Sequence, residues 1–243
     1  MSRLKQLATM LSLVALLTMG LALTAVPAAA QPPDATVTVE VPSIVPPGGS
    51  FVARLNITSV TDLSFATYRI AYDPSVLAVA NVTDGLIGGS PAGVSAVNDW
   101  TNPESEWYGW DAAPGELGVV QGAYVAGEAG LSGSGYLAEI EFDVVGVWCD
   151  TSAISFVLED SEAFAYDEQP INVEWVGTAV TVAPDYDVNG DGEVGFWDMI
   201  GVSVHWDETG LPWWIRADAN RDGGVGFWDM ILVSVHWGES CAS

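Results

Sequence analysis

Two stretches near the end of the chain place oxygen-bearing side chains at alternate positions. Residues 187–206 read DVNGDGEVGFWDMIGVSVHW, and residues 218–237 repeat them as DANRDGGVGFWDMILVSVHW, 31 positions later. Sixteen of the twenty aligned residues are identical. The oxygen-bearing side chains stand at positions 1, 3, 5 and 12 of each copy: Asp187, Asn189, Asp191 and Asp198, then Asp218, Asn220, Asp222 and Asp229. This duplication predicts one kind of site built twice.

The spacing of these oxygens favours a calcium ion in each copy. Ca²⁺ takes roughly six to eight oxygen ligands, so alternate residues of a tightly curved loop point inward and a carboxylate at position 12 closes the cage. Gly192 and Gly223 stand at position 6, where such a loop turns sharply. Position 7 contributes a backbone carbonyl oxygen, so Glu193 and Gly224 can serve equally. The sequence predicts two bound Ca²⁺ ions, and repulsion among the carboxylates predicts that binding is coupled to folding of this segment.

A short helix is expected after each loop. The following segment reads FWDMIGVSVHW in the first copy and FWDMILVSVHW in the second. Its length and its lack of Gly or Pro breaks, Gly201 excepted, favour a helix, although its valines would also suit a strand. The loop context decides for the helix. Residues 184–186 read Pro-Asp-Tyr, so no incoming helix is expected before the first loop.

The loops resemble EF-hand calcium loops that carry Asp in place of the common Glu at position 12. Loop followed by helix, twice, with a linker at 207–217, resembles the type I dockerin domain, and the resemblance covers 187–237. A small α-helical dockerin-like domain is therefore expected at 187–240. Dockerins dock onto cohesin domains and so attach exported proteins, often polysaccharide-degrading enzymes, to a scaffold. The resemblance implies a protein-binding function.

Positions 10 and 11 of the loops are the expected partner-binding residues. In dockerins they often set partner choice and are commonly small and hydroxylated, whereas here they are Phe196-Trp197 and Phe227-Trp228. Aromatic residues at these positions can anchor a partner or fill a small core. We expect one residue of each pair to pack in the core and the other to face the partner.

Residues 34–182 have a different character, rich in β-branched residues with Gly, Pro or Asp clusters between short runs. Such short strands with turn signals predict an all-β sandwich or jelly roll. The predicted strands cover 36–41, 50–60, 63–72, 117–126, 135–147, 153–159 and 176–182.

Two stretches of this region resemble the cohesin family. FATYRIAYDPSVLAV at 65–79 runs a strand into a Tyr-Asp-Pro turn, and GSGYLAEIEFDVVG at 133–146 leads from a Gly-rich turn into a long alternating strand. The resemblance implies a mainly β fold, a cohesin-like jelly-roll sandwich at 34–182. Carbohydrate-binding modules of related jelly-roll shape use similar strands.

A chain that carries both halves of a docking pair raises the question of self-binding. The connector 183–186 spans at most ~14 Å when extended, so folding back onto its own sandwich face is difficult. Head-to-tail association with a second copy, or binding to other cohesin- or dockerin-bearing exported proteins, is therefore expected.

An aromatic cluster between the strands supports an alternative function. Residues 98–116 include Trp107 and Trp110 beside Asn and acidic residues. A flat aromatic strip can stack on sugar rings, which would make the protein a carbohydrate-binding module recruited through its dockerin. The same rings can instead close the end of the sandwich core.

Charge and leader features place the protein outside the cell. With 32 acidic and 6 basic side chains, the net charge is −26, which excludes nucleic acid and anionic membrane surfaces as partners. Residues 1–30 combine a basic start, an uncharged apolar run and small residues before Gln31, as a secretory signal peptide does. The alternative is an uncleaved membrane anchor. We expect a secreted protein, with association at the cell surface as one form of it.

No catalytic residue is expected. Carboxylate pairs such as Glu104 with Glu106, or Asp160 with Glu162, arise by composition alone in so acidic a chain. No nucleophile motif or phosphate-binding glycine loop accompanies them. Cys149 and Cys241 are the only cysteines, and they form either a disulfide or two partly buried thiols. The sequence thus predicts an exported, non-catalytic adaptor.

Overall fold

The computed structural model describes residues 32–99, 113–122, 124–125, 129–211 and 215–241. The predicted signal peptide at 1–30 lies outside these ranges, as do Trp107 and Trp110. Within them, no helix has the length and apolar character needed to cross a lipid bilayer.

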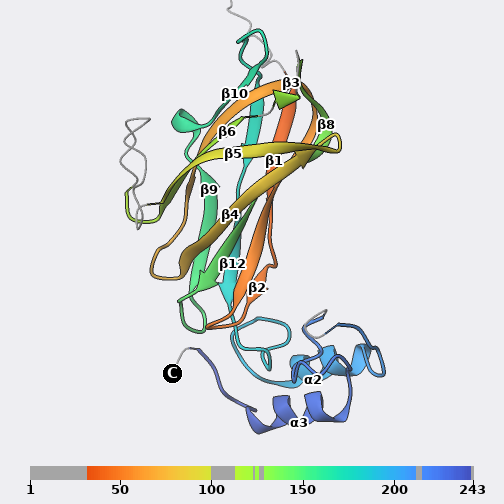
Figure 1. Cartoon of the computed structure of the whole chain (residues 1–243). Coiled ribbons are helices and arrows are strands. Elements are labelled where there is room, and N and C mark those ends of the chain that lie inside the picture. The colour runs from red at the N-terminus through yellow and green to blue at the C-terminus, as the bar shows by residue number, and fades with distance from the viewer. Residues whose placement is uncertain (1–31, 100–112, 123, 126–128, 212–214, 242–243) are drawn as a thin grey trace, which may run out of the picture. The chain divides into compact units, whose positions relative to one another are not determined.

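Strands dominate residues 35–182, which confirms the mainly β prediction (Figure 1). Their order across the hydrogen-bonded sheet is β2-β12-β9-β3-β6-β5-β4-β8-β7, with β1 and β10 pairing to β3 and β11 pairing to β1. The strands are β1 (Ala35–Glu40), β2 (Ile44–Val45), β3 (Ser50–Ala71), β4 (Leu77–Ile87), β5 (Ser90–Asp99), β6 (Glu116–Gly122), β7 (Tyr124–Val125), β8 (Ala129–Val144), β9 (Thr151–Phe156), β10 (Glu162–Ala165), β11 (Val173–Val176) and β12 (Thr178–Val182). A short 3₁₀ helix, η1, covers Leu158–Asp160.

Strand β3 is the longest element and joins neighbours on both of its halves. Its first part pairs antiparallel with β8 and its second part with β6. We expected two strands here, at 50–60 and 63–72, and that division is wrong. The register with β8 shifts between Ile57 and Val60 and again between Val60 and Leu63, so the strand continues through bulges. A bulge bends a strand without ending its pairing, so the two residues between the predicted strands do not form a loop.

Residues 35–182 are called the sandwich below. Their core consists of the side chains that point inward at alternate positions along the strands. Phe142 of β8 is fully buried and packs against two rings, Phe51 at 5.6 Å and Tyr72 at 5.4 Å between centroids. Tyr68 is equally buried, and its hydroxyl faces the Gln121 side chain at 3.4 Å. The alternation of buried and exposed residues along β8 is the pattern that the sequence displayed.

Five strands escaped the sequence prediction: β2, β4, β5, β10 and β11. Strand β5 reads SPAGVSAVND, whose small residues have weak strand propensity. Strand β4 is mostly exposed in its middle, so its apolar residues do not alternate regularly. Pairing with β8 and β6 holds these strands in place, and that is a tertiary effect.

Residues 183–241, called the C-terminal segment below, contain two short helices, α2 (Phe196–Val204) and α3 (Phe227–Val235). Both begin where the sequence predicted them, directly after the loops. Their small core has seven buried members, all aliphatic: Val188, Val194, Val202, Ala217, Ala219, Val225 and Val233.

Candidate functional site

The first loop is closed by its own side chains. The Asp187 carboxylate accepts the backbone N–H groups of Gly190, at 2.8 Å, and Gly192, at 3.1 Å. Asn189 Oδ1 accepts the N–H of Asp191 at 2.9 Å. These bonds curve the chain so that positions 1, 3 and 5 lie on one loop, as the spacing predicted.

Asp198, at position 12, ties this loop to the helix that follows. Its side chain is fully buried and accepts the N–H of Asn189 at 3.1 Å and the N–H of Gly195 at 2.7 Å. The second bond caps the first turn of α2. One carboxylate therefore fixes both the start of the loop and the start of the helix.

The second loop repeats this geometry. Asp218 accepts the N–H groups of Asp222 and Gly223, each at 3.0 Å. Asp229 accepts the N–H of Asn220 at 3.0 Å and that of Gly226 at 2.7 Å. The structure thus brings together the predicted residues of each loop, including the position-7 residues Glu193 and Gly224, whose N–H groups bond to the position-5 aspartates.

The donor set of each loop fits a hard divalent cation. Both loops bury the carboxylates of positions 1 and 12, whose residues are at most 2% exposed. Buried carboxylates require compensating charge, and oxygen-only donors suit Ca²⁺. Burial raises the pKa of Asp187, and the Trp148 hydrogen bond opposes that rise. Within the described ranges, no group of three or more His, Cys, Asp or Glu side chains is arranged to hold a metal ion. A cation in either loop would therefore also need the amide oxygen of position 3 and the backbone carbonyl of position 7.

Each loop is paired with the chain that follows the other helix. Val194 exchanges backbone hydrogen bonds with Glu239 and Gly238, at 2.9 and 2.8 Å. Val225 bonds in the same way with Glu208 and Asp207, both at 2.9 Å. The two repeats are therefore interleaved, so neither loop is complete without the other repeat. Sequence reasoning missed this arrangement, because the pairing is made by backbone atoms.

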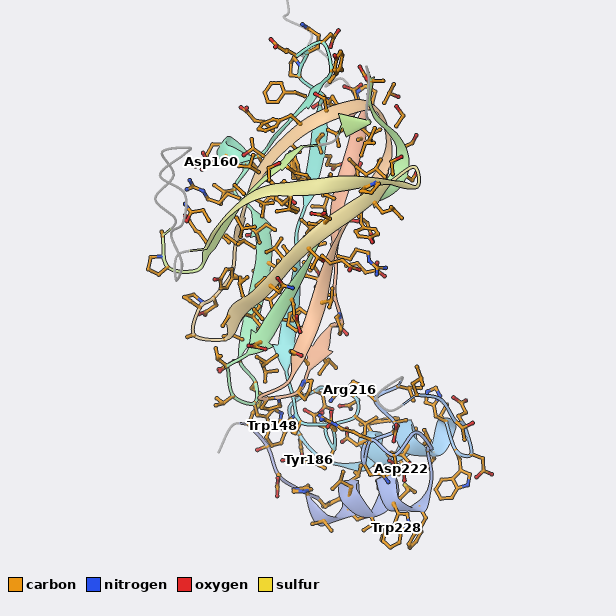
Figure 2. The ribbon with its side chains drawn as sticks, viewed as in Figure 1. Trp148, Asp160, Tyr186, Arg216, Asp222 and Trp228 are labelled. Atoms are coloured by element: carbon orange, nitrogen blue, oxygen red, sulfur yellow. A yellow bond between two sulfur atoms is a disulfide. The ribbon has the colours of Figure 1, made fainter. Side chains whose placement is uncertain are left out.

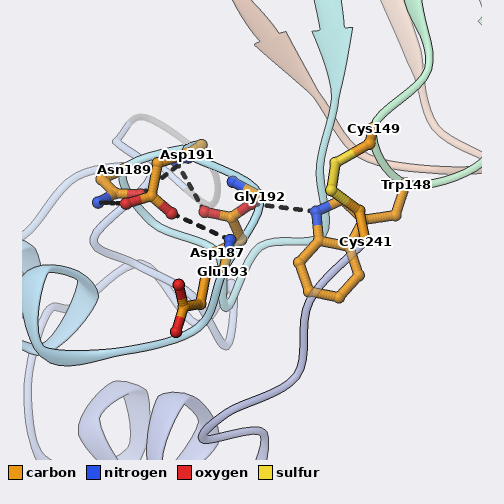
Figure 3. Close-up of a disulfide and its surroundings, with 9 residues drawn as sticks. Trp148, Cys149, Asp187, Asn189, Asp191, Gly192, Glu193 and Cys241 are labelled. Carbon is orange, nitrogen blue, oxygen red and sulfur yellow. Dashed lines mark hydrogen bonds between the residues drawn. A yellow bond between two sulfur atoms is a disulfide. The ribbon is translucent and has the colours of Figure 1, made fainter. Parts of the chain in front are cut away.

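The first loop also touches the β8–β9 connection of the sandwich (Figure 3). The indole N–H of Trp148 donates to Asp187 Oδ2 at 3.1 Å. The neighbouring Cys149 forms a disulfide with Cys241, which settles the alternatives that the sequence left open. The backbone N–H of Cys241 donates to the carbonyl of Gly192 at 3.1 Å. Residues 33–243 form one compact unit that includes these contacts.

Gly192 has a steric as well as a conformational reason to be glycine. Its φ is +87°, a region that residues with a Cβ rarely adopt. A Cβ there would also lie 2.8 Å from the Cys241 sulfur and 3.1 Å from the Cys149 sulfur. The disulfide therefore packs directly on the turn of the first loop.

Arg216, in the linker between the repeats, reinforces the start of the first loop. Its guanidinium donates to the carbonyl oxygens of Pro184, at 2.8 Å, and Val188, at 3.2 Å, and also to that of Asp187. The pKa of Arg216 is lowered by burial, which the charges of nearby aspartates oppose. Arg221 forms an ion pair with Asp185 beside it.

The predicted partner-binding residues are all exposed. Phe196 and Trp197 are 60% and 65% exposed, and Phe227 and Trp228 are 61% and 66% exposed. Figure 2 shows Trp228 projecting outward from α3. The expectation that one residue of each pair packs in the core is wrong, because the buried core of this segment consists of valines and alanines, and the rings packed against it are those of Trp148 and Tyr186.

Further exposed apolar side chains extend both aromatic pairs, and sequence reasoning did not identify them. They lie along α2 and α3 and just after them, at matching positions of the two repeats: Ile200, Val204 and Trp206, then Ile231, Val235 and Trp237. We call these two sets, with their aromatic pairs, the helix faces. A signal was available, because the same residue types recur at the 31-residue period.

One candidate carboxylate pair falls on described residues. Asp160 lies 3.3 Å from Arg69, which also pairs with Glu116 at 3.2 Å. Asp160 therefore belongs to an ion-pair group around a half-buried arginine. The pair Glu104 and Glu106, like the aromatic strip with Trp107 and Trp110, lies outside the described residues.

Comparison with known proteins identifies the sandwich. The family model described as "Cohesin domain" matches residues 35–182. A search of the curated proteins finds no match.

Solved structures of cohesins also resemble this chain. A non-cellulosomal cohesin from the archaeon Archaeoglobus fulgidus is 15% identical, with a TM-score of 0.48, over 64% of this chain and 96% of that one. The cohesin module of a family 33 glycoside hydrolase from Clostridium perfringens is 15% identical, with a TM-score of 0.47, over 62% and 98%. The sixth cohesin of scaffoldin B from Acetivibrio cellulolyticus, solved with a mutant Cel5 dockerin, is 17% identical, with a TM-score of 0.46, over 61% and 99%.

The family match covers residues 35–182, more than half of the chain, and the chain belongs to the cohesin family.

Proposed function

We propose that this protein is a secreted, non-catalytic adaptor that joins other proteins through calcium-dependent cohesin–dockerin docking. Cohesin domains are interaction modules, and homologues of this domain bind dockerin-bearing proteins. The observation that carries the proposal is the C-terminal segment, where two matched loop–helix repeats follow a cohesin domain in one chain. The sandwich supplies one half of a docking pair, and the C-terminal segment supplies the other as a dockerin-like module.

Calcium binding is the part of the proposal that depends on the loops. Asp187, Asn189, Asp191 and Asp198, with the carbonyl of Glu193, would hold one ion; Asp218, Asn220, Asp222 and Asp229, with the carbonyl of Gly224, would hold the other. When bound, Ca²⁺ neutralises the buried carboxylates and holds the loops closed. The side chains of positions 1 and 12 already bind loop N–H groups, so they orient the turn and the helix start.

Docking is assigned to the helix faces. Each face exposes two aromatic rings at the start of a helix and further apolar residues along it. Large exposed aromatic residues are the commonest anchors of protein interfaces. Because the two faces are nearly identical in sequence and exposure, we infer that both recognise the same kind of partner surface.

Export is supported by the disulfide, since disulfides persist mainly in oxidising compartments outside the cytoplasm. The leader-like residues 1–30 point the same way. Placement in a polysaccharide-degrading or cell-surface assembly is the expected context of such an adaptor.

Binding to a panel of purified cohesin- and dockerin-bearing proteins tests the function. The full chain is immobilised, and binding is measured by surface plasmon resonance with Ca²⁺ and then with a chelator. Cohesin-bearing partners should bind through the helix faces, and the double variant Trp197→Ala, Trp228→Ala should lose about 2 kcal/mol or more of binding free energy.

Tyr166→Ala is the matched control, because Tyr166 is 51% exposed but belongs to the sandwich. It should leave cohesin binding unchanged. Binding that persists in the chelator, or that the double tryptophan variant does not weaken, would contradict the proposed docking mode.

A further inference from the structure

The two loops are nearly identical in sequence, yet the Trp148 indole and the Cys149–Cys241 disulfide meet the first loop. The chain has two cysteines, and their single disulfide packs on the turn of the first loop. The indole of Trp148, from the same β8–β9 connection, reaches a candidate ligand of that loop. The first loop is thus built partly from its own repeat and partly from the cohesin domain.

Trp148 is held in place by aromatic packing. Its ring meets the ring of Tyr186 edge to face, with 6.1 Å between the centroids. Tyr186 in turn stacks on His236, with centroids 3.7 Å apart and planes within 4°. Because Tyr186 directly precedes Asp187, this stack positions the indole N–H beside the carboxylate that opens the loop.

The two carboxylate oxygens of Asp187 accept different hydrogen bonds. Oδ2 accepts the N–H of Gly192 and the indole N–H of Trp148, whereas Oδ1 accepts the N–H of Gly190. An indole nitrogen can only donate, so its bond requires an acceptor lone pair on Oδ2. The carboxylate cannot rotate without breaking these bonds, which leaves Oδ1 as the oxygen with the fewer protein partners.

The disulfide holds the other side of the loop. Cys241 anchors the strand-like tail whose residues Gly238 and Glu239 bond to Val194, and its own N–H bonds to Gly192. Positions 6 and 8 of the loop are therefore tied to a segment that is covalently fixed to the sandwich. Fixing a loop in its binding conformation lowers the entropy that binding must remove.

We propose that Trp148 and the Cys149–Cys241 disulfide are positioning elements of the first calcium loop, so that the cohesin domain raises the affinity of that loop for Ca²⁺ and leaves the second loop unaffected. This inference rests on the proposed function, because it assumes that the loops bind calcium. Groups that orient metal ligands typically change metal affinity by about 10- to 100-fold when they are removed.

Calorimetric titration with Ca²⁺ in two matched full-length backgrounds tests the proposal. Asp218→Asn with Asp229→Asn leaves the first loop to be measured, and Asp187→Asn with Asp198→Asn leaves the second. Into each background we introduce Trp148→Phe, which keeps the ring and removes the N–H donor, or Cys149→Ser with Cys241→Ser.

In the background that retains the first loop, either change should raise the Kd for Ca²⁺ by about tenfold or more. In the other background, the Kd should change less than twofold. Circular dichroism and the thermal midpoint of the sandwich report whether each variant is folded, and Trp148→Phe provides a test that does not depend on the folding of the cysteine variant.

Equal effects in both backgrounds, or no effect of Trp148→Phe on the first loop, would overturn the inference. Either result leaves the proposed function intact if the unsubstituted chain binds two Ca²⁺ ions. A chain without any calorimetric calcium response would instead refute the proposed calcium sites, and the inference with them.

Discussion

The sandwich and the C-terminal segment differ in the kinds of side chain that they bury. The sandwich encloses large side chains such as Phe142, Tyr68 and Leu55, all fully buried. In the C-terminal segment the buried apolar residues are valines and alanines, the rings of Phe196, Trp197, Phe227 and Trp228 are exposed, and four aspartates are buried. We therefore expect hydrophobic burial to stabilise the first region, and neutralisation of the buried carboxylates to stabilise the second.

Removal of calcium should produce the largest difference in stability between the two regions. With a chelator, the C-terminal segment should lose its helices while the sandwich keeps its strands, because repulsion among buried carboxylates then has no compensation. Limited proteolysis should cut within 187–237 and spare 35–182, and circular dichroism should lose helical signal only. Equal protection of both regions in the chelator would show that the small valine core is sufficient.

A large-to-small substitution in the sandwich should have the converse effect. Phe142→Ala removes a fully buried ring that contacts Phe51 and Tyr72, and should lower the free energy of unfolding by ~3–5 kcal/mol. Denaturant unfolding followed by circular dichroism measures this loss. Calcium affinity of the second loop should remain unchanged, and a large decrease there would mean that the two regions are not energetically distinct.

Alkaline pH should destabilise the sandwich through Tyr68. Burial raises the pKa of Tyr68 far above its usual value near 10. The native state therefore keeps a proton that the unfolded state releases, so stability is full below pH 10 and falls at higher pH by up to about 1.4 kcal/mol per pH unit. Urea unfolding at pH 9 and pH 11 measures the effect. Tyr68→Phe should reduce this pH dependence, and an unchanged slope in that variant would contradict the assignment.

The smallest effect on stability is expected at the helix faces. Trp228→Ala should change the free energy of unfolding by no more than about 0.5 kcal/mol, because its ring is 66% exposed. Thermal unfolding in the presence of Ca²⁺ measures this. A loss comparable to that of Phe142→Ala would place the tryptophan in a core after all, and its proposed docking role would then have no support.

Local patterns carried a large part of the prediction. The 31-residue repeat, the position of each loop and the helix starts at Phe196 and Phe227 were all readable, since ligand spacing and turn glycines act within a dozen residues. The mainly β character of 34–182 was readable from its runs of β-branched residues and the turn residues between them. The missed strands β4 and β5 show the limit of this approach, because their weak patterns are stabilised by distant partners.

The sequence by itself determined which residues could bind a cation and that the chain combines a β domain with a duplicated segment. Only the tertiary structure decided that Cys149 pairs with Cys241, that Trp148 reaches Asp187, and that each loop is completed by the other repeat. It also decided that both rings of each aromatic pair face outward. These facts depend on which distant segments pack together, and packing is set by the shape and volume of the whole core rather than by any local spacing.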